Sequence, residues 1–204
     1  MELRRVDRDL PAVTVLALLL TGPRHAWEMH RLIVDTHKDF VTGLPRSMYH
    51  AVDRLLRDEL IAVHDVLRDG PRPERTVYAL TDAGRASLRD RVGRLLAVPD
   101  PDATLFVAAL SYVAVLPVPD AVARLRERTA TLDAQIRRLD AAVATVPPTL
   151  PRLLLVESEF ERARLAAELA WVTDFVERIE DGRMPWPGPI DGLVDLLPDG
   201  PPLD

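Results

Sequence analysis

The chain has no cysteine among its 204 residues. This absence excludes disulfide bonds, thiolate metal ligands and a cysteine nucleophile, so stability must come from packing. Long hydrophobic runs are missing as well, since the longest, Ala12 to Leu20, is far shorter than the roughly 20 apolar residues that cross a bilayer. The basic start, Met1 to Arg5, is followed by no apolar stretch with a small-residue cleavage site, which argues against a secretory signal. We therefore expect a cytoplasmic protein without a membrane partner.

Motifs of catalysis and of metal or cofactor binding are also missing from the sequence. No Gly-rich phosphate loop precedes a predicted helix, and serine, histidine and aspartate do not occur in a nucleophile-elbow context. The histidines all lie in the first half of the chain: His25, His30, His37, His50 and His64. None of them is four residues from another histidine, which is the spacing of a zinc pair on a helix. We expect no enzyme activity, no metal site and no cofactor.

Charge is distributed unevenly between the two halves. The net charge of −6 argues at first against DNA, because neutralisation of phosphates supplies most nonspecific affinity. Residues 1–96, however, contain 16 Arg and Lys against 14 Asp and Glu, whereas residues 97–204 contain 10 against 18. This split indicates two units with different roles, of which only the first could approach nucleic acid.

Capping residues and hydrophobic periodicity predict three helices in the first 60 residues. Asp9 begins an apolar helix that ends at Gly22-Pro23. A second helix starts near His25, and a third starts at Ser47 and leaves a polar face exposed.

From Ile61 onward the period of the hydrophobic pattern changes from about 3.6 residues to about two, which predicts a strand. A turn at Asp69 to Pro73 and a second strand at Arg75 to Leu80 complete a hairpin. Thr81 caps a fourth helix that continues to about Leu96. This order predicts a winged helix-turn-helix domain over residues 1–97.

Beyond Pro99 and Pro101 the sequence predicts helices almost throughout, which defines a second domain at 98–182. An apolar helix is expected at Phe106 to Val115, followed by long helices at Pro119 to Val146 and Pro151 to Glu180. The Pro-rich tail, residues 183–204, is expected to be disordered. The fold class is therefore mainly α, with a small β-hairpin wing and a coiled-coil-like dimerisation domain.

The first long helix carries a heptad seam. Its members recur at alternating spacings of three and four: Val122, Leu125, Thr129, Leu132, Ile136, Leu139, Val143 and Val146. Such a seam needs a partner, and a second copy of the chain would supply one, so we expect a homodimer. In the second long helix, Phe160, Ala167 and Trp171 form an additional stripe, which indicates two neighbours for that helix.

Four short motifs in the first half occur in a characteristic order. They are Gly22-Pro23 followed by His25-Ala26-Trp27-Glu28, Ser47-Met48-Tyr49, Arg72-Pro73, and Tyr78-Ala79-Leu80-Thr81-Asp82-Ala83-Gly84. In order and spacing, residues 12–96 resemble the PadR family of bacterial transcriptional regulators, which has His-Gly-Tyr-Glu, Ser/Thr-Leu-Tyr and Tyr-x-Leu-Thr-x-x-Gly at the corresponding places. The second half is similar in pattern to the longer helical dimerisation domain of one PadR subgroup.

Three residues depart from the family pattern. Asp53 stands where the family usually has a basic residue, and a carboxylate near phosphates weakens binding unless it accepts a hydrogen bond from a cytosine amino group. Glu59 replaces the usual glycine after the third helix, which predicts that this turn lacks a left-handed cap. Glu74 lies among the basic residues of the wing.

A recognition helix needs a short side chain at its start and a polar face that reaches base edges. On this basis we expect DNA contacts from the third helix and from the wing: Arg46, Ser47, Tyr49, His50 and Arg54, together with Arg68, Arg72 and Arg75. The alternative is that the arginines and His50 are solvated surface charge and that Tyr49 is a packing residue.

The resemblance implies a homodimeric regulator, a repressor that binds a pseudo-palindromic operator in double-stranded DNA. It also implies release by a small apolar or aromatic effector. Candidate walls of an effector pocket are four aromatic residues: Phe106, Tyr112, Trp171 and Phe175. The alternative for these residues is plain core. The rival function is a winged-helix module that binds protein and not DNA, which the acidic total charge, Asp53 and Glu74 favour.

Overall fold

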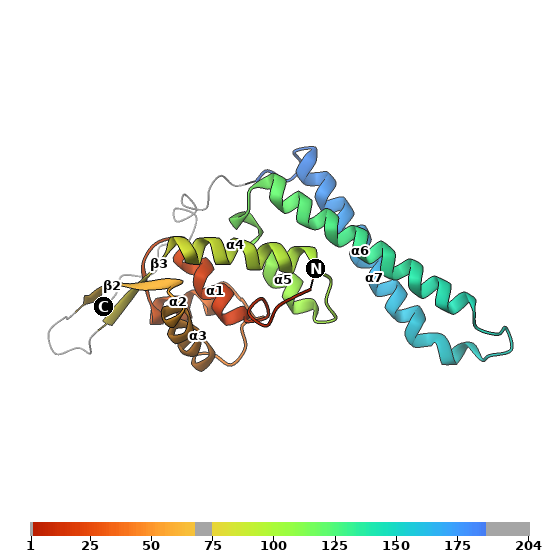
Figure 1. The fold of residues 1–204 in the computed structure, drawn as a ribbon, viewed down its shortest axis with the longest axis horizontal. Coiled ribbons are helices and arrows are strands. Elements are labelled where there is room, and N and C mark those ends of the chain that lie inside the picture. Colours follow the sequence, from red (N-terminus) through yellow and green to blue (C-terminus); the bar gives the residue numbers. More distant parts are fainter. Residues whose placement is uncertain (1, 68–74, 187–204) are drawn as a thin grey trace.

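The computed structural model describes residues 2–67 and 75–186. Along the chain it contains α1 (Leu10–Leu19), β1 (Arg24–His25), α2 (Ala26–Asp35), α3 (Arg46–Arg57), β2 (Ile61–Leu67), β3 (Arg75–Leu80), α4 (Asp82–Ala97), α5 (Ala103–Ser111), α6 (Val118–Ala144) and α7 (Val156–Glu180). A compact body formed by α1 to α5 and the sheet lies at one end, and α6 and α7 project from it as a long hairpin (Figure 1). The expected fold class, mainly helical with a small wing and long C-terminal helices, is confirmed.

The first helix, α1, is buried on nearly all sides and forms the centre of the body. Asp9 caps it, because its carboxylate accepts a hydrogen bond from the Ala12 amide at 3.3 Å. The helix α2 begins with an unusual cap in which His25 Nδ1 accepts from the Trp27 amide and Glu28 accepts from the His25 amide. Helices α1 to α4 together enclose the larger hydrophobic core of the described residues.

The sheet has three strands in the order β1-β3-β2, where the sequence predicts only a two-stranded hairpin. The additional strand β1 has two residues and pairs antiparallel with β3, so that Arg24 lies opposite Tyr78. A strand this short has no periodicity to detect, and this is why pattern reasoning missed it. Its pairing fixes the start of α2 against the base of the wing.

The start of α4 packs directly on the turn between α3 and β2. Thr81 caps α4 by accepting from the Gly84 amide at 3.0 Å, and its own hydroxyl donates to the carbonyl oxygens of Glu59 and Leu60. A Cβ atom on Gly84 would lie 2.0 Å from the Leu60 carbonyl oxygen. Only glycine permits this approach of helix to turn.

The apolar helix predicted at Phe106 to Val115 has different bounds. Asp102 caps α5 by accepting from the Thr104 amide, so the helix begins earlier, at Ala103. It ends at Ser111, and a short 3-10 turn follows at Val113–Val115. At this end the Tyr112 hydroxyl donates to Thr14 Oγ1 of α1 at 2.9 Å. Because that contact joins segments far apart in sequence, local periodicity does not reveal it.

The two long helices pack antiparallel against each other within one chain (Figure 1). Leu125, Leu132 and Ile136 of the heptad seam are buried, and Leu132 and Ile136 form a second core cluster with Leu165 of α7. The seam is thus covered by the same chain, so it does not by itself require a second copy. The second long helix also differs at its start, because residues 152–155 form a 3-10 turn before α7.

The larger core continues across residue 97, where the two predicted domains meet. Leu88, Val92 and Leu95 of α4 belong to the same cluster as Val172 and Val176 of α7. In the described part of the chain, no helix combines the length and apolar character that a membrane span needs.

Replacement of Gly84 by alanine tests the close approach of α4 to the preceding turn. The added methyl group would press on backbone, which has little freedom to move, so we expect the free energy of unfolding to fall by about 2 kcal/mol or more. Urea denaturation followed by circular dichroism measures this change.

Gly93 in the same helix provides a matched control. A Cβ atom there would meet only the Arg124 side chain, at an ordinary contact distance of 3.5 Å. Gly93→Ala should therefore raise stability by about 0.5–1 kcal/mol, because glycine is unfavourable inside a helix. Equal effects of the two substitutions would contradict the proposed role of Gly84.

Candidate nucleic-acid interface

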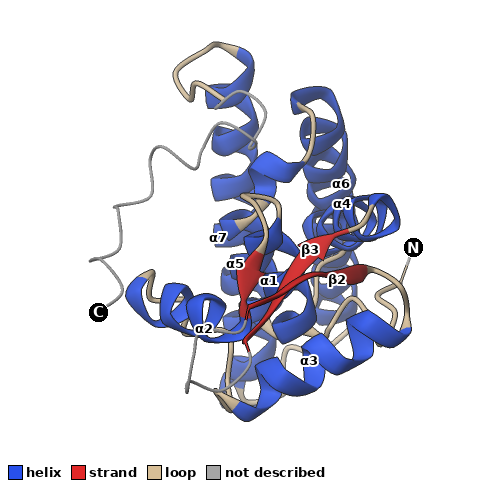
Figure 2. Cartoon of the chain, turned by 90° about the vertical axis from the view of Figure 1, so that its left-hand side faces the viewer, coloured by secondary structure: helices blue, strands red, loops and turns tan. Residues whose placement is uncertain are grey.

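Helix α3 separates its residues into a buried face and an exposed face. Met48, Ala51, Val52 and Leu55 are buried against the body, and this anchors the helix. The opposite face carries residues that are exposed to solvent: Arg46, Tyr49, His50, Asp53 and Arg57. Helix α3 and the wing strands lie at the end of the molecule away from the tip of the hairpin (Figures 1 and 2).

Two of the predicted DNA-contacting residues interact with each other. Arg46 Nε donates to His50 Nε2 at 3.3 Å, one helical turn along α3. The Ser47 hydroxyl donates to the Thr42 carbonyl oxygen at 2.7 Å, which ties the start of α3 to the preceding loop. Tyr49 is 47% exposed and therefore not a core residue. Arg46, Tyr49 and His50 are all accessible on one surface.

Arg54 lies in a different environment from the other polar residues of α3. Its guanidinium forms an ion pair with the Asp9 carboxylate at 2.6 Å and so joins α3 to the N-terminal cap of α1. The other oxygen of that carboxylate accepts the α1 cap hydrogen bond from the Ala12 amide. Arg54 would have to leave Asp9 to reach a base, whereas His50 would not.

The turn after α3 has the left-handed cap that its sequence seemed to exclude. Glu59 adopts a φ of 56°, and the Leu60 amide donates to the Leu55 carbonyl while the Glu59 amide donates to the Leu56 carbonyl. This is the Schellman pattern that glycine usually supplies. The expectation for Glu59 was therefore wrong. The left-handed conformation costs a non-glycine residue roughly 1–2 kcal/mol, which packing of Leu60 and α4 on the turn offsets.

The wing is described in part. Arg75 is exposed at the start of β3, opposite Leu67 of β2, whereas Arg68, Arg72 and Glu74 lie outside the described residues. Tyr78 of β3 faces α3: burial raises the pKa of its phenol, and the nearby charge of Asp53 adds to this rise. Asp53 of α3 thus lies near Tyr78 of the sheet.

Two basic features are not among the predicted DNA contacts. Arg57 continues the exposed face of α3 seven residues after His50, a spacing that the sequence already contained. A cavity of about 590 Å³ is lined by residues from the N-terminal segment, α3 and α4, among them Arg5, Arg8 and Arg91. No local pattern could reveal this cavity, because tertiary packing assembles it.

The four aromatic residues proposed as effector walls separate into two groups. Trp171 stacks on Phe175 with ring centroids 5.1 Å apart, and Phe106 meets Trp171 edge-on at 6.2 Å. Tyr112 instead lies beside Phe40 and bonds to α1. The structure thus brings Phe106, Trp171 and Phe175 together, and their rings pack against one another.

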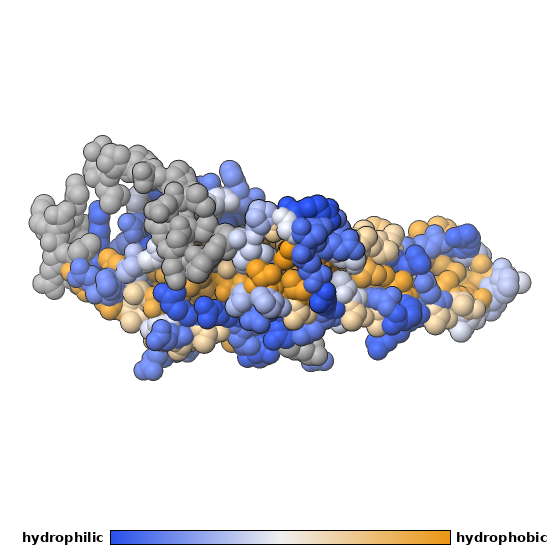
Figure 3. All heavy atoms as spheres, turned by 90° about the horizontal axis from the view of Figure 1, so that it is seen from above, coloured by the Kyte–Doolittle hydropathy of each residue, from blue (hydrophilic) through white to orange (hydrophobic). Residues whose placement is uncertain are grey.

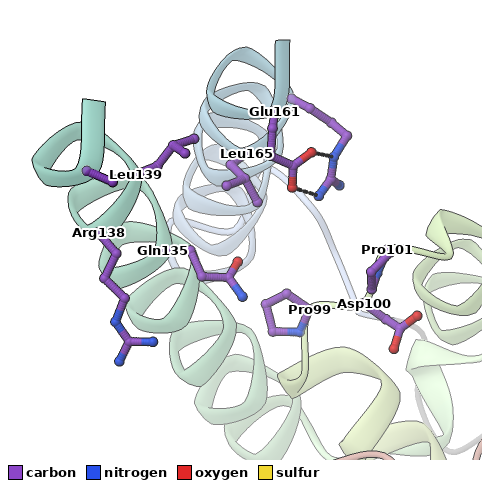
Figure 4. Close-up of a pocket in the computed structure, with 10 residues that line it drawn as sticks. Pro99, Asp100, Pro101, Gln135, Arg138, Leu139, Glu161 and Leu165 are labelled. Carbon is purple, nitrogen blue, oxygen red and sulfur yellow. Dashed lines mark hydrogen bonds and ion pairs between the residues drawn. The ribbon is translucent and has the colours of Figure 1, made fainter. Parts of the chain in front are cut away.

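A cavity of about 410 Å³ lies elsewhere, between the α4–α5 connection and the long helices (Figure 4). Pro99 and Pro101 form one wall, and Leu139 of α6 and Leu165 of α7 form the others. Gln135 points into the space between them, while Glu161 pairs with Arg164 at 2.7 Å. The predicted aromatic residues do not line this cavity.

The arrangement of α1, α2 and α3, the β2–β3 wing and α4 defines a winged helix-turn-helix domain. Residues 15–90 match the family described as Transcriptional regulator PadR-like family. Over these residues the chain is similar to the domain of PadR-like transcriptional regulators. Among curated proteins, none matches the sequence.

Solved structures with similar chains include Bacillus subtilis PadR in complex with operator DNA, at 17% identity and a TM-score of 0.40 over 82% of this chain and 98% of that one. Another is smu.1604c from Streptococcus mutans UA159, at 18% identity and a TM-score of 0.39 over 84% of this chain and 97% of that one. A third is Bacillus subtilis PadR in complex with p-coumaric acid, at 16% identity and a TM-score of 0.38 over 84% of this chain and 99% of that one. The similarity to the family rests on the match over residues 15–90 and not on these distant likenesses.

Proposed function

We propose that this protein is a DNA-binding transcriptional repressor that acts as a homodimer on a pseudo-palindromic operator. In this proposal each α3 enters a major groove, the wing contacts the neighbouring backbone, and occupancy blocks the promoter. The observation that carries the proposal is the exposed face of α3, where Arg46, Tyr49 and His50 are accessible on a helix whose other face is anchored in the core.

Within this surface the residues have different roles. His50 and Tyr49 project from the middle of α3 and are the best placed to reach base edges. Arg46 and Ser47 at its start, and Arg75 on the wing, suit phosphate contacts. Arg54 joins this set only after release from Asp9, so its contact with DNA would require a rearrangement.

The surface proposed for dimerisation is the outer stripe of α7, which we define as Val156, Phe160, Ala163, Ala167 and Trp171. These residues recur at helical spacing on the side of α7 that faces away from the seam, and all are exposed. Phe160 is 71% exposed and Trp171 is 44% exposed. Hydrophobic side chains are visible along the projecting hairpin in Figure 3. A contiguous apolar stripe of this kind is typical of a protein interface.

For an effector, the cavity in Figure 4 offers more room than the aromatic cluster. Its volume lies within the range of small-molecule sites, and its walls combine apolar side chains such as Leu139 and Leu165 with polar and charged ones such as Gln135 and Arg138. A small apolar or aromatic molecule placed here would contact Pro99 and Pro101, which connect the DNA-binding half to the hairpin. We include release by such an effector in the proposal.

Substitutions on α3 and on the wing should separate base contacts from phosphate contacts. His50→Ala should weaken binding to the operator by about 1–3 kcal/mol and binding to a random sequence by less, as for a lost base contact. Arg75→Ala should weaken both equally and reduce the salt dependence by about one unit, as for a lost phosphate contact. Mobility-shift assays with the protein's own upstream region, at several salt concentrations, measure both effects.

Two further substitutions, at Asp53 of α3 and at Arg137 of α6, complete this test. If Asp53 only repels phosphate, Asp53→Ala strengthens binding to every DNA. If Asp53 accepts from a cytosine, the substitution weakens binding to the operator and strengthens binding to random DNA. Arg137→Ala on the exposed surface of α6 removes the same charge as Arg75→Ala and should leave affinity unchanged. If no substitution on α3 or the wing alters binding to any DNA, the protein-binding rival becomes the better account.

Light scattering at micromolar concentration tests the dimer. The wild-type protein should have twice the chain mass of 22.8 kDa. Phe160→Glu should produce a monomer, because the substitution places a charge in the middle of the proposed interface while the exposed position leaves the fold intact.

Val63→Glu is the matched control for the same apolar-to-acidic change. Val63 is 52% exposed on β2, at the end of the molecule away from the hairpin tip. This variant should remain a dimer. A wild-type protein that is monomeric and folded would refute the proposed assembly, and a dimeric Phe160→Glu variant would place the interface elsewhere.

A further inference from the structure

The cavity of about 590 Å³ between the N-terminal segment, α3 and α4 has a basic lining, and the proposed function assigns no ligand to it. The charged residues that line it are four arginines and two aspartates: Arg5, Arg8, Arg54 and Arg91, with Asp9 and Asp58. Val6, Ala12 and Leu55 form the apolar part of the wall. Arg8 is engaged outside the cavity, because it pairs with Asp100. The volume lies within the range of small-molecule sites.

Arg91 of α4 is the buried cation of this lining, and it is only 6% exposed. Its Nε atom donates to the Ser87 hydroxyl at 3.1 Å, and its Nη1 atom donates to the Val6 carbonyl at 3.3 Å. Among the described residues, no carboxylate pairs with Arg91 and no group accepts a hydrogen bond from its Nη2 atom. A buried charge is normally paired, so this guanidinium retains capacity for an anion.

The other buried arginine of the described chain shows the contrast. Arg128 pairs with the Glu168 carboxylate at 2.6 Å, whereas Arg91 has only neutral hydrogen-bond acceptors. Burial lowers the pKa of Arg91, and the charges of the surrounding aspartates oppose this effect. Arginine keeps its proton in proteins, so a positive charge remains where water solvates it poorly. An anion from solution would compensate that charge.

The aspartates of the cavity leave this demand unmet. The Asp9 carboxylate is already engaged, because it pairs with Arg54 at 2.6 Å and also caps α1. Asp58 is exposed at the end of α3, and it forms no described ion pair with Arg91. Arg5 is exposed and has no ion pair with any described residue. Arg5 and Arg91 are therefore both available to a ligand.

We propose that this cavity binds the phosphate monoester of a small, partly apolar molecule. The phosphate accepts hydrogen bonds from Arg91 and Arg5, and the organic part of the ligand packs against Val6 and Leu55. The planar guanidinium matches the spacing of phosphate oxygens, and a dianion compensates two arginines where a carboxylate compensates one. Because Leu55 belongs to α3, the ligand would contact the helix proposed to read DNA.

The test is isothermal titration calorimetry of the full-length protein with phenyl phosphate at pH 7.5 and constant ionic strength. Phenyl phosphate is mostly a dianion at this pH. We expect a dissociation constant below about 1 mM, and binding at least about tenfold weaker for phenol, which lacks the phosphate. Benzoate has the same ring with one negative charge, and inorganic phosphate has no ring, so both should bind more weakly than phenyl phosphate.

Three substitutions locate the site. Arg91→Met removes the guanidinium and keeps an unbranched side chain, and it should weaken phenyl phosphate binding by at least about tenfold. Arg5→Ala should weaken binding in the same direction, and its exposed position leaves the fold intact even if Arg91→Met does not fold. Arg89→Met is the matched control, because it removes an exposed charge of α4 outside the cavity and should leave the affinity unchanged.

Three results would overturn the proposal. The first is the absence of phenyl phosphate binding, or binding no tighter than that of phenol or benzoate. The second is an unchanged affinity in folded Arg91→Met or in Arg5→Ala. The third is an equal loss of affinity in Arg89→Met and Arg5→Ala, which would indicate attraction to surface charge in general. None of these measurements involves DNA, so they stand independently of the proposed function.

Discussion

The guanidinium of Arg128, 2% exposed, lies where four helices meet. It donates to the carbonyl oxygens of Leu95 and Leu96 in the last turn of α4, and of the C-cap residue Val98, at 3.0–3.3 Å. It also pairs with Glu168 of α7 at 2.6 Å, and its central carbon lies 3.7 Å from the ring centroid of Phe106 on α5. One side chain of α6 therefore caps the last helix of the winged domain and joins it to both helices beyond.

This contact determines how the hairpin is attached to the winged-helix half. Burial lowers the pKa of Arg128 and the Glu168 carboxylate opposes that effect, but arginine keeps its charge in proteins. Loss of one partner from a buried pair costs about 3–5 kcal/mol, so the arrangement is strongly held. If two chains associate through α7, the same contact sets the distance and angle between their recognition helices. The cavity at Pro99 and Pro101 lies beside this junction.

Much of the fold could be predicted from caps and periodicity. Asp9, Thr81 and the prolines around residue 100 predict the helix ends correctly. The heptad seam predicts that α6 pairs with another helix, but it does not show that this helix is α7 of the same chain. Arg128 could not be predicted, because an arginine beside a heptad seam is normally a surface residue and only the tertiary structure buries it. The same limit applies to the candidate site. The exposed face of α3 follows from its periodicity, whereas the pairing of Arg54 with Asp9 depends on the packing of α3 against α1.

In the proposed assembly, a dimer presents two α3 helices at a fixed separation to the two halves of one operator. Hydroxyl-radical footprinting, on a DNA fragment that the protein selects from a random-sequence pool, tests this claim most directly. We predict two protected segments of related, inverted sequence whose centres lie about 10 base pairs apart or a multiple of that distance. A single protected segment, or two segments at variable separation, would contradict the account.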